Sequence, residues 1–276
     1  MNLKWLVGII LLIVFGITLV FGALAKATEK ETVVDATTLA VALMFNRNGL
    51  DDESEIKEIQ RKLKLGRTDS FQLIPGLNIT VTAEDFNLEN KTPREARLAF
   101  FRQLTEPIYD EGAAGLAKLA TNEEMRQSIV ESAGPLAIVT AERHALINKI
   151  FQIGLAISAV LFIALIALSF RFGRLVSPAI VLLITSVPGA VLFFIIKTTA
   201  GKNLAPPKIS FGESGMMESL GSLAGVILPP MAGAVLPVYL VPAIIGAALL
   251  VIAILGKIVY SIVRRTRRSD TSKVNS

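Results

Sequence analysis

His144 and Ser214 are the two residues of this chain that could combine as a general base and a nucleophile. His144 is the only histidine, and Ser214 lies in a Gly-Glu-Ser-Gly tetrapeptide, a pattern found around some serine nucleophiles. The longer Gly-x-Ser-x-Gly pattern is not met, because Met216 occupies its last position. A hydrolase acting at the membrane face is one hypothesis, and it requires His144 within hydrogen-bond reach of Ser214. The alternatives are a polar residue at a stalk or interface and a serine in a loop.

Neither a metal site nor a cofactor is predicted. A chain with no cysteine and one histidine cannot build a zinc site of the usual ligands. The acidic run from Asp51 to Glu58 lacks the central glycine of a calcium loop. Negative charge there is explained by a helix start, where it interacts favourably with the helix dipole.

An ionisable residue in the middle of an apolar segment would be the strongest sign of transport, because a charge is costly in hydrocarbon. The sequence has none near mid-depth. Lys197 and Lys257 lie near segment ends and can extend to the headgroups. This pattern argues against a proton-coupled transporter or an ion pump. It leaves open a pore formed by backbone groups or by several copies of the chain.

Four apolar segments determine the fold class. The ranges 5–24, 150–170, 175–196 and 236–263 each reach about 20 predominantly apolar residues, the length needed to cross a bilayer. They are predicted to be transmembrane helices, since lipid offers no hydrogen-bond partner to an open backbone. The predicted fold class is therefore mainly α: a four-helix integral membrane protein with a mostly helical extracytoplasmic domain between the first two spans.

Charge divides the chain in the same way. Residues 26–149 hold 16 Lys and Arg and 20 Asp and Glu, a net −4, and the remainder carries +9, giving the formal +5. Basic charge beside apolar segments excludes the usual nucleic-acid binder. Basic residues near span ends mark the cytoplasmic side and attract lipid headgroups. They are Lys4, Arg171, Arg174, Arg264, Arg265, Arg267 and Arg268. The predicted topology in the cell (plasma) membrane has both termini in the cytoplasm and residues 26–149 outside.

The predicted domain organisation has four parts. They are an N-terminal transmembrane anchor (1–25), an extracytoplasmic helical domain (26–149), a three-helix membrane bundle (150–263) with an outer Pro/Gly-rich loop (197–235), and a basic cytoplasmic tail (264–276). A secretory signal cleaved after Ala25 is the alternative for the first part, because Lys4 and the small residues Ala23 and Ala25 fit that pattern. The length of the apolar stretch favours a retained anchor.

Helix-start signals organise the 26–149 domain. Thr92, followed by Pro93 and by Glu95, predicts a helix that begins with a capping box. Further helices are predicted over 35–45, from Asp52, over 111–119 and over 122–132, with a short β-hairpin over 70–82. The pattern from Pro135 to Phe170 reads as one long helix that would couple this domain to the second span. A break near Asn148 is the alternative.

Small residues four positions apart predict close helix packing within the membrane. They are Gly154, Ser158, Ser186, Ala190, Ala243 and Ala247. Such spacing permits contact within the chain or between copies, so a homo-oligomer is a second implication.

The 201–242 segment is rich in proline and glycine. Residues 214–227 have apolar positions at helical spacing, which predicts a helix lying at the outer interface and ending at Leu228-Pro-Pro. A re-entrant loop lining a cavity is the alternative, because irregular backbone at membrane depth is tolerated there.

Three functional hypotheses follow. The leading one is a non-enzymatic integral membrane protein of the cell envelope whose outer domain binds or senses a protein partner, with the membrane bundle as anchor or assembly platform. The second is a channel or small-solute transporter that uses the 201–242 segment. The third is the membrane-face hydrolase that rests on Ser214 and His144.

Overall fold

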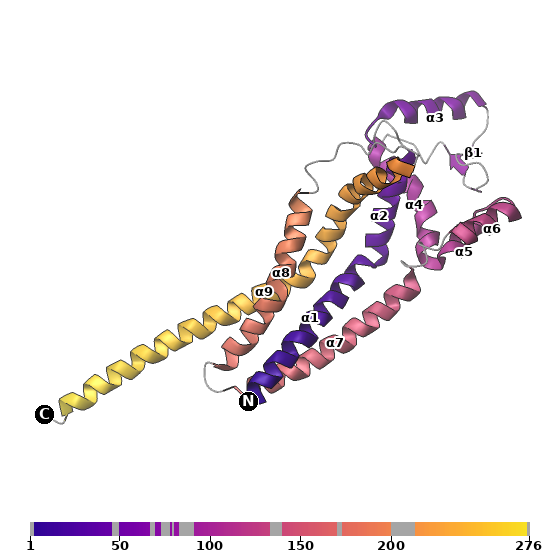
Figure 1. Ribbon diagram of the computed structural model, residues 1–276. Coiled ribbons are helices and arrows are strands. Elements are labelled where there is room, and N and C mark those ends of the chain that lie inside the picture. The colour runs from indigo at the N-terminus through magenta and orange to yellow at the C-terminus, as the bar shows by residue number, and fades with distance from the viewer. Residues whose placement is uncertain are drawn as a thin grey trace. The chain divides into compact units, whose positions relative to one another are not determined.

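The computed structural model describes residues 3–45, 50–66, 70–72, 78, 80–82, 91–132, 140–169, 173–199 and 213–274, which are mainly helical (Figure 1). The helices are α1 (Leu3–Ala27), α2 (Lys30–Phe45), α3 (Glu53–Gly66), α4 (Pro93–Glu111), α5 (Ala113–Lys118), α6 (Glu123–Ser132), α7 (Ala141–Ala167), α8 (Gly173–Thr199) and α9 (Glu213–Val274). The strands are β1 (Ser70–Gln72) and β2 (Thr80–Thr82).

Four helical segments are long and apolar enough to cross a membrane. They are α1, α7, α8 and the Ile227–Ile262 part of α9. Their large side chains face outward in many places: Trp5, Val160 and Ile163 are 67%, 66% and 68% exposed. An apolar surface of this size is stable in hydrocarbon and costly in water. The prediction of four helices that could span a membrane is thereby confirmed, and the chain fits a multi-pass membrane protein in contact with lipid.

The chain divides into two compact units. Met1–Ala25, Ile147–Phe194 and Val235–Ser276 form the first, here called the bundle unit. Lys26–Leu146 and Ile195–Ala234 form the second, here called the polar unit. The polar unit therefore contains the described end of α8 and the beginning of α9 as well as the segment between the first two spans.

Two aromatic pairs join neighbouring helices of the bundle unit. Phe15 of α1 meets Phe162 of α7 edge to face, with ring centroids 5.5 Å apart. Phe193 of α8 stacks on Tyr239 of α9, also at 5.5 Å. Gly189 makes the second contact possible, because a Cβ added there would overlap the Tyr239 ring. One aromatic pair thus joins α1 to α7, and the other joins α8 to α9.

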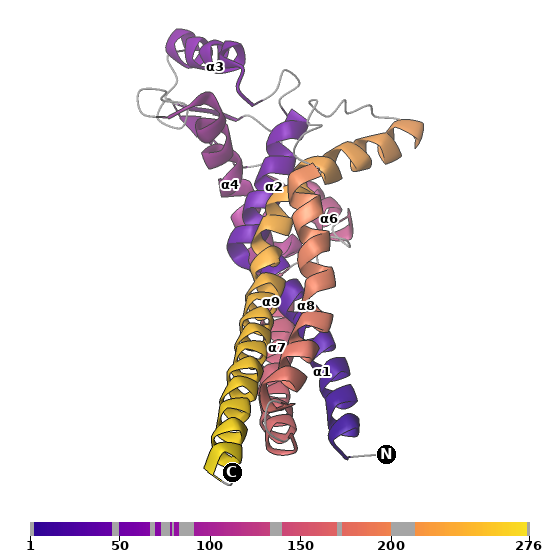
Figure 2. The same cartoon turned by 90° about the vertical axis from the view of Figure 1, so that its left-hand side faces the viewer.

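The core of the polar unit lies where α2 and α4 pack together. Phe100 and Phe101 of α4 are 1% and 3% exposed and meet edge to face at 5.3 Å. Leu104 of α4, Ala42 of α2 and Ile56 of α3 complete the same buried cluster. Each fully buried side chain of this size contributes about 1.5–3 kcal/mol. Ile56 contributes to this core from α3, which Figure 2 shows near one end of α4.

The capping box at the start of α4 is confirmed. Thr92 Oγ1 accepts a hydrogen bond from the Glu95 N–H at 3.2 Å, and Glu95 Oε2 accepts one from the Thr92 N–H at 2.8 Å. The two groups satisfy donors that a helix start otherwise leaves open. Asp52 serves α3 in a related way, accepting from the Ser54 N–H at 2.9 Å.

Two strands pair in the 70–82 region. β1 and β2 are antiparallel, with Phe71 opposite Val81. Most of the connection between them lies outside the described residues, and three residues a strand is at the short end of the usual range.

α9 differs from its predicted form, and α7 decides between the two forms predicted at Asn148. α9 does not end at Leu228: it continues through Pro229 and Pro230, so the predicted stop was wrong. Proline removes a backbone donor, but membrane helices tolerate it because neighbouring groups satisfy the freed carbonyls. The predicted loop 197–235 is helical up to Thr199 and from Glu213 on, and the residues between lie outside the described part. α7 begins at Ala141 and passes Asn148 without interruption, so the alternative of a break there was wrong. Residues 135–139 of the predicted long helix lie outside the described part.

Candidate functional site

Of the two residues in the hydrolase hypothesis, the structure describes the side chain of His144. His144 lies in the first turn of α7, where its Nδ1 is 3.2 Å from the Thr28 hydroxyl. The side chain of Ser214 lies outside the described residues. The Thr28 carbonyl accepts a hydrogen bond from the Tyr109 hydroxyl at 2.9 Å. Thr28, at the α1–α2 junction, thereby joins α4 to the start of α7, a structural role that the sequence did not indicate.

Charged groups reinforce this junction. Lys30 Nζ donates to Asp110 Oδ2 at 2.8 Å, and this hydrogen bond raises the pKa of Lys30 above its ordinary value. Tyr109 is 4% exposed, and its burial, followed by the nearby Asp110 charge, raises the pKa of its phenol. Both groups therefore keep their protons at neutral pH. The junction is polar but carries no titration near pH 7 from these two residues.

The predicted topology residues lie at helix ends where the structure describes them. A Cβ added to Gly173, the first residue of α8, would lie 3.4 Å from Lys4 Nζ. Arg174 Nε donates to the Ser169 carbonyl at 3.0 Å, which caps the end of α7. Arg171 lies outside the described residues. Arg264, Arg265, Arg267 and Arg268 belong to α9, and only their backbone is described.

The predicted packing pair of α7 faces α1. A Cβ added to Gly154 would lie 2.6 Å from Thr18 Oγ1, so this close approach requires glycine. Ser158 is 1% exposed, and its Oγ lies 3.4 Å from the same Thr18 Oγ1. Hydroxyl contacts of this kind between membrane helices are worth about 0.6 kcal/mol on average. Gly154 and Ser158 therefore form one contact surface with α1.

The remaining small residues divide between packed and open positions. Ser186 is fully buried and donates to the Leu182 carbonyl of its own helix, and Ala243 is 9% exposed. Ala190 is half-buried and Ala247 is exposed. Gly246, one position before Ala247, takes the close contact: a Cβ there would lie 3.0 Å from the Leu182 side chain.

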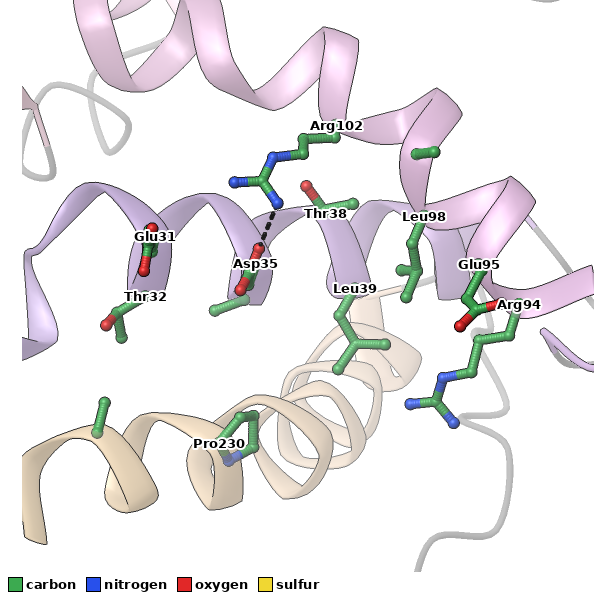
Figure 3. Close-up of a pocket in the computed structure, with 13 residues that line it drawn as sticks. Glu31, Thr32, Asp35, Thr38, Leu39, Arg94, Glu95, Leu98, Arg102 and Pro230 are labelled. Carbon is green, nitrogen blue, oxygen red and sulfur yellow. Dashed lines mark hydrogen bonds and ion pairs between the residues drawn. The ribbon is translucent and has the colours of Figure 1, made fainter. Parts of the chain in front are cut away.

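A groove in the polar unit is the strongest candidate for a binding site (Figure 3). It has a volume of about 610 Å³, within the range of sites for small molecules. One side of α2, one side of α4 and the beginning of the apolar part of α9 line it. The lining residues are Glu31, Thr32, Asp35, Ala36, Thr38, Leu39, Arg94, Glu95, Leu98, Ala99, Arg102, Pro230 and Ala234.

Apolar side chains form the walls of this groove. Leu39 of α2 and Leu98 of α4 are partly buried and also pack against the core of the unit. Pro230 of α9 lies opposite α2 in Figure 3, and Ala234 of the same helix also lines the groove. The Thr38 hydroxyl is paired with that of Thr105 at 2.6 Å, so it is already satisfied within the unit. The groove therefore combines an apolar interior with charged residues along its rim.

The rim charges differ in how they are paired. Arg102 Nη1 lies 3.2 Å from Asp35 Oδ1, and its Nε lies 3.3 Å from Glu106 Oε1. Glu95 is engaged by Thr92, and hydrogen bonds from the Thr92 backbone and then its hydroxyl lower the pKa of Glu95. Among the described residues, Arg94 has no ion-pair partner. A guanidinium in this position remains available to a carboxylate or phosphate.

Comparison with known proteins gives no relative: no family model matches the sequence, and no curated protein or solved structure matches it. Among the described residues, no group of three or more histidine or acidic side chains could hold a metal ion. Function is therefore argued from the groove and the spans alone.

Sequence reasoning missed the groove for an identifiable reason. Arg94, Leu98 and Arg102 are spaced by four, so they share one side of α4. Glu31, Asp35 and Leu39 have the same spacing in α2. This periodicity was available in the sequence. That Pro230 and Ala234 close the groove was not, because α9 was predicted to be interrupted there.

Proposed function

We propose that this chain is a non-enzymatic integral membrane protein of the cell envelope whose polar unit binds a partner in the groove between α2, α4 and α9. The bundle unit serves as anchor. The observation that carries the proposal is the groove itself, about 610 Å³ with an apolar interior and a charged rim. Apolar walls supply binding energy and a few charged groups supply orientation, the usual composition of a ligand site.

The proposal includes a topology in the cell (plasma) membrane. Both termini lie in the cytoplasm and residues 26–149 lie outside, because Lys4, Arg174 and the basic end of α9 belong to one side by the positive-inside rule. The chain contains no cysteine, so single-cysteine variants can test this directly. Lys91→Cys should react with a membrane-impermeant maleimide in intact cells, and Ser276→Cys should react only after permeabilisation. The reverse labelling pattern would show that the proposed topology is wrong and that residues 26–149 lie in the cytoplasm.

Binding in the groove is tested by photo-crosslinking. A benzophenone amino acid placed at Leu98 of the full-length chain should form an adduct in native membranes. A matched probe at Glu124, an exposed position of α6 outside the groove, should not form the same adduct. Filling the groove with Ala234→Phe should abolish the Leu98 adduct. A Leu98 probe that forms no adduct, or an adduct unaffected by Ala234→Phe, would show that the groove is not a binding site.

A further inference from the structure

We infer that the occupant of the groove is an anionic membrane lipid, with its headgroup at Arg94 and one acyl chain along Leu39, Leu98 and Pro230. This inference rests on the proposed function, because it names the partner of the same site. It is drawn from the charge distribution of the rim, the origin of the groove walls, and the hydrogen bonding available inside.

The two ends of the groove carry opposite charges on the rim. Glu31 and Asp35 lie toward the beginning of α2, whereas Arg94 lies in the first turn of α4, beyond Leu39 in Figure 3. Glu31 and Leu39 are eight residues apart, about 12 Å along the helix. An anionic headgroup is attracted to the Arg94 end and repelled from the Glu31 end. Arg102 contributes less, because Asp35 and Glu106 already neutralise it.

The walls place the groove within reach of lipid. Pro230 and Ala234 belong to the Ile227–Ile262 stretch that is apolar enough to cross a membrane. α2 begins at Lys30, three residues after the first candidate span ends at Ala27. The α9 wall is therefore continuous along the helix with apolar surface, which suits a hydrocarbon chain better than a soluble polar ligand.

Hydrogen bonding disfavours a peptide. All three walls are helices whose backbone groups are used internally, so an extended peptide would bury N–H and C=O groups with few partners. A peptide helix satisfies its own backbone but is about 10 Å wide. An acyl chain has no polar groups to satisfy and a smaller cross-section.

The test uses tryptophan fluorescence and lipids brominated on one acyl chain, which quench by contact. Trp5 is the only tryptophan, so a Trp5→Phe/Leu98→Trp chain in nanodiscs reports on the groove alone. Brominated phosphatidylglycerol, diluted into unlabelled phosphatidylcholine, should quench at about fivefold lower mole fraction than brominated phosphatidylcholine does, given about 1 kcal/mol for each basic contact. Arg94→Gln should remove that preference, and Arg94→Lys should retain most of it.

Lys91→Gln provides the matched control. Lys91 is exposed and lies one turn before Arg94 but does not line the groove, so its loss should leave the preference intact. Equal quenching by both lipids, no quenching by either, or an equal loss in Lys91→Gln would overturn the inference. If the Leu98 probe crosslinks to a protein and brominated lipid does not quench, the groove is a binding site but its occupant is not a lipid. If neither the Leu98 adduct nor the lipid quenching is observed, both the binding site and its lipid occupant are refuted.

Discussion

Arg97 offers a quantitative test of how the polar unit is held together. Its side chain is 2% exposed, yet its guanidinium donates hydrogen bonds to the carbonyls of Leu50 and Asp52, each at 2.6 Å. These two residues form the approach to α3. Arg97 therefore attaches α3 to α4 from inside the unit. Arg97→Met keeps most of the length of the side chain and removes every donor.

The magnitude follows from the two bonds. A hydrogen bond that involves a charged group contributes about 1.5–3 kcal/mol, and the variant leaves the buried Leu50 carbonyl and the half-buried Asp52 carbonyl without this donor. The expected loss is about 3–6 kcal/mol for the docking of α3. Because 1.4 kcal/mol corresponds to a factor of ten, the opening equilibrium of α3 should rise by about 10² to 10⁴.

Hydrogen–deuterium exchange of the full-length chain in nanodiscs measures this opening. Amides of α3 should exchange faster in Arg97→Met by up to that factor, while those of α7 and α8 should not change. Arg97→Lys retains the charge but cannot direct two parallel donors, so it should fall between. Arg94→Met is the control, since Arg94 is exposed on the same helix and should change stability by less than about 0.5 kcal/mol. Unchanged α3 exchange in Arg97→Met, or an equal increase in Arg94→Met, would refute the reasoning.

Four further outcomes are expected. Gly189→Ala should destabilise the bundle in thermal denaturation because its Cβ overlaps the Tyr239 ring, and the second change Tyr239→Leu should restore part of the loss; no recovery would contradict the packing. Thr92→Ala should cost about 1 kcal/mol of helix stability, seen as faster exchange in the first turn of α4. The pKa of Glu95 is lowered from 4.5, so the ionised side chain stabilises the first turn of α4 above that pH. This stabilisation is lost as the pH falls through the lowered pKa. Glu95→Gln should therefore remove the acid dependence of hydrogen exchange in the first turn. Gly115→Ala should expose α5 to proteolysis, because a Cβ there clashes with a backbone carbonyl of α4.

Features with local causes were predictable from the sequence. The four spans follow from apolar length, and the start of α4 follows from Thr92, Pro93 and Glu95, all within one turn. Each of these features depends on residues that are close in sequence, so one sequence is enough to predict it. Residues 35–45 were predicted helical for the same reason, although α2 begins earlier, at Lys30.

Features with distant causes were not predictable. Pro229 and Pro230 locally indicate the end of a helix, but α9 continues through them, since a helix near lipid has no better backbone alternative. The contact of His144 with Thr28 joins residues 116 positions apart, and nothing in the local pattern of either indicates it. The groove combines both difficulties, because its third wall depends on α9 being continuous.

The groove is completed late in synthesis, because its third wall comes from the last helix of the chain. α2 and α4 are finished by residue 111, whereas Pro230 and Ala234 emerge more than 100 residues later, after α7 and α8. Because chains fold largely as they are made, the core of the polar unit can form well before the groove exists. A chain that stalls before α9 would have a folded core and an open, two-walled cleft. Occupancy of the groove would therefore distinguish chains whose last span has been made from those in which it is missing.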